Sequence, residues 1–253
     1  MGNVTKVGLA CEKSMVQQID LSGKTLFVSP RKSIVGQGLA AQLKLPASAI
    51  NAVFVAEMLA QVEQSGGRRV LFAALPFDLN AKAHIQVPEQ VMVLTSPFDD
   101  FILDAVLPMQ AGSVLSIPSA QRYKNMVSTA LNAIDDQSLS KVVLSRSLQI
   151  SAQINVSNLI KKLLSSHRDG YKFAFYHEDA EGMMATLIGA SPELLLSKSG
   201  LSVVSNPLAG SIPRCADPDE DQRRAQNLLK SIKDLYEHEL FVRSVASVLR
   251  PLC

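Results

Sequence analysis

The sequence has no tryptophan, and aromatic residues make up only 5% of it. Proteins that bind single-stranded nucleic acids stack bases on aromatic rings, so this composition disfavours such a surface. The formal net charge of +2 over 253 residues also gives no basic footprint for nucleic acid or for an anionic membrane. We therefore expect neither nucleic acid nor a membrane among the partners of this protein.

Long apolar runs and a cysteine framework are missing as well. No apolar stretch approaches the ~20 residues of a membrane span, and the N-terminal residues lack the apolar segment of a secretory signal. The three cysteines, Cys11, Cys215 and Cys253, lie far apart and show no zinc-ligand spacing. Free thiols are typical of a reducing compartment, so we expect a cytoplasmic protein.

Apolar patterns and turn signals alternate along the chain. Strands are expected at 24–29, 69–75, 141–150 and 171–176, and helices at 50–62, 119–134, 156–167 and 219–249. Strands and helices mix without strict alternation, which indicates an α+β fold. Short strands and loops are expected at 78–118, and no linker divides the chain, so residues 1–253 are expected to form a single domain.

The segment from Met183 to Ser211 predicts three strands separated by short polar breaks. Glu193 falls at a bend between two apolar runs, where burial would favour the protonated form of a general acid. An exposed turn glutamate is the ordinary alternative. Gly210, near the end of the segment, suits a close approach of the backbone to a ligand.

Two further ionisable residues have positions that could serve chemistry. Lys141 begins a predicted apolar strand, and it is either a surface lysine or a desolvated amine that acts as a general base. Glu237 lies in a predicted helix, and it is either one charge on a solvated face or an oxygen ligand for Mg²⁺. The common nucleotide-binding, metalloprotease and serine-hydrolase motifs are absent.

Four motifs taken together are more specific for a protein family than these single residues are. LSKVVLSR (139–146), GASPELLL (189–196), NPLAGS (206–211) and KDLYEHEL (233–240) resemble, in order and spacing, the chorismate-utilising enzymes. That family includes anthranilate synthase component I and the aminodeoxychorismate, salicylate and isochorismate synthases. The resemblance covers most of residues 24–250 and implies a large α/β sandwich with a central cleft.

Two positions discriminate between the members of this family. Lys141 matches the lysine that activates water in isochorismate and salicylate synthases, and Ala209 stands where aminodeoxychorismate synthase has a nucleophilic lysine. Water is therefore the implied nucleophile. The segments 26–36 and 75–89 look most like the isochorismate synthases of catecholate siderophore pathways, which lead to 2,3-dihydroxybenzoate.

The resemblance also implies a mechanism. Mg²⁺, held in part by Glu237, binds the ring carboxylate of chorismate, and Lys141 takes a proton from the water that attacks C2. Glu193 donates a proton to the departing C4 hydroxyl, and the backbone at Gly210 approaches the substrate. A downstream enzyme that uses isochorismate is the implied partner.

The sequence departs from the family pattern at its C-terminal side, where members continue with a second magnesium carboxylate and an arginine for a substrate carboxylate. We therefore expect an incomplete chorismate-binding domain that is inactive or poorly folded by itself. Two other functions stay open: a salicylate synthase, which continues to pyruvate elimination, and a non-catalytic remnant.

Overall fold

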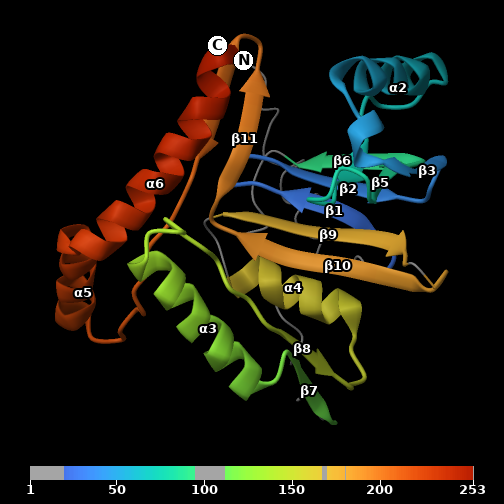
Figure 1. Ribbon diagram of the computed structural model, residues 1–253. Helices are drawn as coiled ribbons and strands as arrows, with labels where there is room; N and C mark the ends of the chain where they lie inside the picture. The colour runs from blue at the N-terminus through green and yellow to red at the C-terminus, as the bar shows by residue number, and fades with distance from the viewer. Residues whose placement is uncertain (1–19, 95–111, 167–169, 180, 253) are drawn as a thin grey trace, which may run out of the picture. The chain divides into compact units, whose positions relative to one another are not determined.

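The computed structural model describes residues 20–94, 112–166, 170–179 and 181–252 (Figure 1). These residues form two compact units, each built from two separate stretches of chain. The first unit contains residues 20–94 and 154–192, and the second contains 112–153 and 193–252. The expectation of a single domain over 1–253 stays a prediction.

The first unit contains a five-stranded antiparallel sheet. Its strands, in spatial order, are β10 (Met184–Ser191), β9 (Tyr171–Glu178), β1 (Thr25–Val28), β2 (Ser33–Gln37) and β6 (Gln90–Leu94). Helix α4 (Val156–Ser166) contacts β9 and β10 (Figure 1). The buried core between them consists of Leu21, Leu26, Val28, Val35, Ile160, Leu164 and Ala174.

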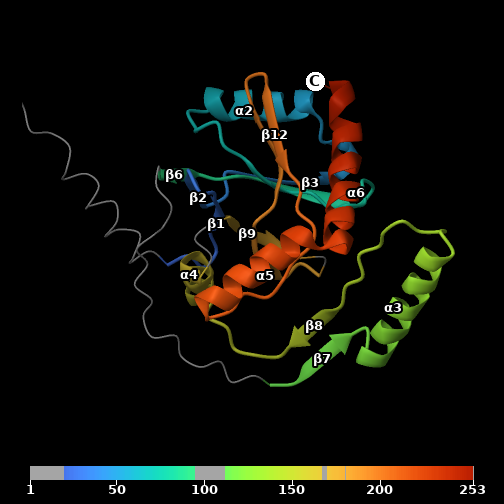
Figure 2. The same cartoon turned by 90° about the vertical axis from the view of Figure 1, so that its left-hand side faces the viewer.

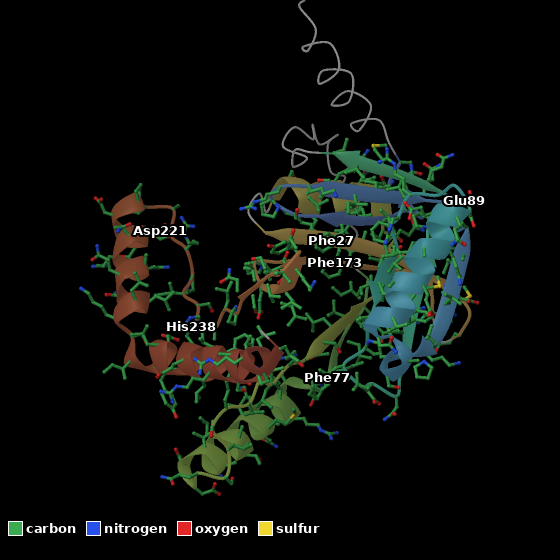
Figure 3. All side chains as sticks on the ribbon, turned by 90° about the horizontal axis from the view of Figure 1, so that it is seen from above. Phe27, Phe77, Glu89, Phe173, Asp221 and His238 are labelled. Atoms are coloured by element: carbon green, nitrogen blue, oxygen red, sulfur yellow. The ribbon has the colours of Figure 1, made fainter. Side chains whose placement is uncertain are left out.

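On the face of this sheet opposite Leu26 and Val28, the ring of Phe173 fills the space beside a glycine of the neighbouring strand. Phe27 on β1 is the cross-strand partner of Phe173 on β9 (Figure 3), and Phe173 is in turn paired with Gly189 on β10. A Cβ added at Gly189 would lie 2.4 Å from the Phe173 ring. The ring therefore occupies the space that a side chain at position 189 would need.

A second, three-stranded antiparallel sheet lies in the same unit. Its order is β3 (Ala41–Pro46), β5 (Lys82–Val87) and β4 (Phe72–Ala74). The turn η1 (Ala47–Ala49) and helix α2 (Ala52–Gln64) follow β3. The side chain of Asn51 caps α2 by accepting a hydrogen bond from the N–H of Phe54.

Polar side chains connect the two sheets. Gln86 on β5 is 2% exposed, and it accepts a hydrogen bond of 2.7 Å from the Thr25 hydroxyl and donates one to the Tyr176 carbonyl. The rings of His84 and His177 meet edge to face at 5.3 Å. Lys44 and Glu178 form an ion pair at 2.7 Å.

The described part of the second unit contains two antiparallel strand pairs and three α-helices. Strand β7 (Val114–Ile117) pairs with β8 (Ser147–Ile150), and β11 (Leu194–Ser199) pairs with β12 (Ser202–Asn206). The helices are α3 (Ala120–Asp135), α5 (Pro218–Lys230) and α6 (Ile232–Leu249), followed by the turn η2 (Arg250–Leu252). Figure 2 shows β7 leading directly into α3, and α5 leading into α6.

The structure confirms the α+β composition and corrects two elements. The helix expected over 219–249 is two helices, because Ser231 takes an extended conformation (φ −70°, ψ 110°) and caps the start of α6. The strand expected over 141–150 is shorter, since only Ser147–Ile150 pairs with β7 and residues 141–146 lack regular structure.

Some expectations concern residues outside those described. Part of the loop region expected at 78–118 falls on residues 95–111, which are not described, and the same holds for Cys11 and Cys253. Cys215 is a half-buried free thiol. Among the helices of the described ranges, none is long and apolar enough to cross a membrane.

We predict that the contact between the two sheets is sensitive to pH through His84. Burial, together with the neighbouring His177 and Lys44, lowers the pKa of His84 below its ordinary value of 6.5, against an opposing effect of Glu178. The folded state then binds fewer protons than the unfolded chain, so this contribution to stability is present above pH ~6.5 and is lost as the pH falls.

Hydrogen exchange of the β5 amides, corrected for the intrinsic rate at each pH, measures the effect. Protection should fall between pH 7 and pH 5 by a larger factor in the native protein than in a His84→Gln variant. An equal loss in both proteins would contradict the role of His84.

Candidate functional site

All four residues predicted to act in chemistry lie in the second unit. Lys141 precedes β8, and Glu193 lies between β10 and β11. Gly210 belongs to the loop between β12 and α5, and Glu237 lies on α6. Contacts on one face of α6 bring Lys141, Gly210 and Glu237 together.

Lys141 is held by two residues of that face. Its ammonium nitrogen lies 3.3 Å from Oε1 of Glu237 and 5.3 Å from the centre of the Phe241 ring. The Lys141 and Glu237 side chains are 27% and 35% exposed. Glu237 and Phe241 are four residues apart, which places them on the same side of the helix. The lysine is therefore half-buried and paired, and it lies outside a strand, whereas the sequence predicted that it begins one.

Asp234 lies three residues before Glu237, on the same helical face. The Ser231 hydroxyl donates a hydrogen bond of 2.5 Å to Oδ2 of Asp234, and the backbone N–H of Asp234 donates one of 3.3 Å to the Ser231 hydroxyl oxygen. The Ser231 hydrogen bond lowers the pKa of Asp234, with help from the positive charge of Lys233. Asp234 is thus an anion that fixes the first turn of α6.

Gly210 packs directly against this turn. Its φ is +83°, a value that side chains other than glycine rarely adopt, and an added Cβ would lie 3.0 Å from Cβ of Asp234. Local backbone geometry and contact with α6 already require glycine here. Its predicted approach to a substrate stays a prediction.

The loop that carries Gly210 is also fastened to α5. Asp221, labelled in Figure 3, accepts hydrogen bonds from Nε of Arg214 at 2.8 Å and from the N–H of Cys215 at 2.9 Å. Arg224 donates to Glu220 and to the carbonyl of Pro213. Both helices therefore hold this loop in place.

Glu193 occupies the bend between strands that the sequence predicted. The residue is half-buried. The expected burial of both flanking strands is not observed, because the side chains of Leu195 and Leu196 on β11 are 80% and 49% exposed. A two-stranded ribbon such as β11–β12 cannot bury both of its faces by itself.

Glu237 is the carboxylate that the sequence predicted as a partial ligand of Mg²⁺. Within the described ranges, no group of three or more histidine, cysteine, aspartate or glutamate side chains could hold a metal ion. Glu237 supplies one carboxylate, and one of its oxygens already faces Lys141. Mg²⁺ usually keeps several waters and takes one or two protein carboxylates together with substrate oxygens, so magnesium binding in part by Glu237 stays a prediction.

Sequence reasoning assigned no role in the site to Asp234 or Phe241. Both lie at helical spacing from Glu237, at minus three and plus four, so the period of the helix could have pointed to them. No sequence signal indicated that Lys141 would contact this face.

A separate cavity of about 220 Å³ lies in the first unit. It is lined by Gly23, Thr25, Gly36, Gly38, Leu39, Phe72, Gln86, Pro88 and Tyr176. None of the four predicted site residues is among them.

Comparison with known proteins finds close sequence relatives. A family model described as "Chorismate binding enzyme" matches residues 54–253. The isochorismate synthase DhbC of Bacillus subtilis (strain 168) is 44% identical over 209 residues, which are 79% of this chain and 51% of that protein. The vibriobactin-specific isochorismate synthase of Vibrio cholerae is 36% identical over 234 residues, which are 90% of this chain and 57% of that protein.

A solved structure has the same fold. The crystal structure of DhbC from Bacillus anthracis, provisionally assigned as a 2,3-dihydroxybenzoate-specific isochorismate synthase, matches with a TM-score of 0.81 and 35% identity. The match covers 94% of this chain and 63% of that one. The expected fold class is therefore confirmed, and the chain spans about half the length of the curated relatives that it matches.

We predict that Gly210→Ala destabilises the second unit by about 1–2 kcal/mol from the positive φ, with a further loss from the contact with Asp234. Gly200→Ala is the matched control, because Gly200 has φ +57° and nothing within 4 Å of an added Cβ. Urea unfolding of both variants measures the difference. Equal destabilisation would show that Asp234 does not restrict position 210.

Proposed function

This chain belongs to the family of chorismate binding enzymes, and on that premise we propose that it is part of an isochorismate synthase. Such an enzyme converts chorismate to isochorismate by adding water at C2 and removing the C4 hydroxyl. The observation that carries the proposal is the placement of Lys141 against Glu237 and Phe241 on one face of α6. The names of the relatives support the same activity.

Lys141 is the proposed general base. Its amine takes a proton from the water that attacks C2, which requires that the amine be uncharged and within hydrogen-bonding reach of that water. The Lys141 nitrogen lies 3.3 Å from Oε1 of Glu237, so this contact has to open before the amine can reach the water. We propose that substrate binding draws Glu237 away from Lys141.

Glu193 is the proposed general acid. Its carboxylic acid donates a proton to the C4 hydroxyl, which leaves as water while the ring double bonds shift. One water enters at C2 and one leaves from C4, so the reaction is an isomerisation. The backbone at Gly210 is proposed to approach the substrate from the loop that α5 and α6 hold.

The names of the relatives also support a proposal about the pathway that uses the product. One is named as specific for vibriobactin, and the solved structure is provisionally assigned to 2,3-dihydroxybenzoate. We therefore propose that the product feeds a catecholate siderophore pathway, through a second enzyme that consumes isochorismate. Magnesium dependence, a cytoplasmic location and inactivity of the isolated chain remain predictions.

In the full-length gene product, Lys141→Ala and Glu193→Gln should each lower kcat by at least ~100-fold, because each removes a proton-transfer group. Chromatographic analysis of the products of chorismate measures turnover and identifies the product. Matched controls are Lys198→Ala, whose ammonium contacts the carbonyl of Gly200, and Glu239→Gln, whose carboxylate pairs with Arg243 on the surface of α6. Both controls should remain near native turnover.

Each alternative has its own outcome in this assay. Near-native turnover by either variant would contradict the catalytic role assigned to the substituted residue. Formation of salicylate and pyruvate by the native protein would replace the proposal with a salicylate synthase. No turnover by the full-length protein would favour a non-catalytic remnant.

A further inference from the structure

We propose that Phe241 is a positioning residue for Lys141, and that its ring keeps the amine in place on α6 during turnover. The inference rests on the proposed function, in which Lys141 activates water. It concerns a residue that the motif comparison did not include.

The backbone of Lys141 does not fix its side chain. Residues 141–146 have no regular secondary structure, and the first strand residue after them is Ser147. A long lysine side chain on such a segment has many rotamers available. Contacts with α6 must therefore select the position of the amine.

Phe241 provides one of the two contacts that do so. The Lys141 nitrogen lies 5.3 Å from the ring centre, within the ~6 Å range of a cation–π contact. Glu237, one helical turn away, provides the other contact at 3.3 Å. The amine thus lies across two successive turns of a single rigid helix.

The two contacts differ in what can displace them. The Glu237 carboxylate is 35% exposed, so salt, a cation or a hydrogen-bond donor of the substrate can compete for it. The Phe241 ring carries no net charge, so salt weakens this contact less than it weakens the ion pair. The lysine side chain can therefore stay packed on the Phe241 ring when Glu237 turns to another partner, whether the amine is charged or neutral. A displacement of ~1 Å can cost about 100-fold in rate, so this contact has kinetic consequences.

A spectroscopic experiment tests the placement without any assay of activity. Ring currents from Phe241 should shift the ε-CH₂ resonance of Lys141 upfield, in protein labelled at lysine and assigned with a Lys141→Arg variant. Phe241→Leu should abolish the shift, and Phe241→Tyr should retain it. An unshifted Lys141 resonance in the native full-length protein would overturn the inference, whatever the protein catalyses.

A kinetic experiment tests the role. In the full-length protein, Phe241→Leu should lower kcat about 10-fold and change KM by less than about 2-fold, while Phe241→Tyr should restore kcat to within about 3-fold of native. Val242→Ala is the control, because Val242 is the next residue on α6 and is 39% exposed. Melting temperatures of all three variants show whether any loss reflects unfolding.

The outcomes separate the inference from the proposed function. If Phe241→Leu turned over like Val242→Ala, or if Phe241→Tyr were as slow as Phe241→Leu, the positioning role would be wrong although the enzyme is active. If the native protein did not turn over chorismate, the proposed function would be wrong. The contact between Lys141 and Phe241 would then have no catalytic role. The ring-current shift would then still decide where Lys141 lies.

Discussion

One face of helix α6 determines where the candidate chemical groups lie. Asp234, Glu237 and Phe241 share that face because a helix repeats every 3.6 residues. Lys141 and Gly210 come from segments without regular structure, and each takes its place by contact with this face. A rigid helix can order two irregular segments at once, since its own backbone hydrogen bonds do not depend on them.

The start of α6 is therefore as important as its face. Ser231 ends α5 and caps α6, and its hydroxyl binds the carboxylate of Asp234. Had the two helices continued as one, Asp234 would lie in a helix interior without the capping hydrogen bond. In the first unit, polar side chains play a comparable role, because Gln86 and His84 join two sheets through specific partners.

Local signals predicted much of the secondary structure. The helix expected at 119–134 is observed as Ala120–Asp135, because an apolar stripe and the Ser119 cap act within a few residues of each other. The helix expected at 219–249 was too long, since a serine break resembles an ordinary polar position in the sequence. The strand expected at 141–150 was too long because an apolar run does not reveal where its partner strand ends.

The sequence by itself determined the α+β class, the resemblance to chorismate-utilising enzymes and the residues that could act in chemistry, because residue types and motif spacing are local properties of the chain. Only the tertiary structure decided that Lys141 contacts Glu237 and Phe241, and that Gly210 packs against Asp234. These pairs are separated by 24 to 100 positions. Contacts over such distances depend on how the whole unit packs, and that packing is not encoded in any single segment.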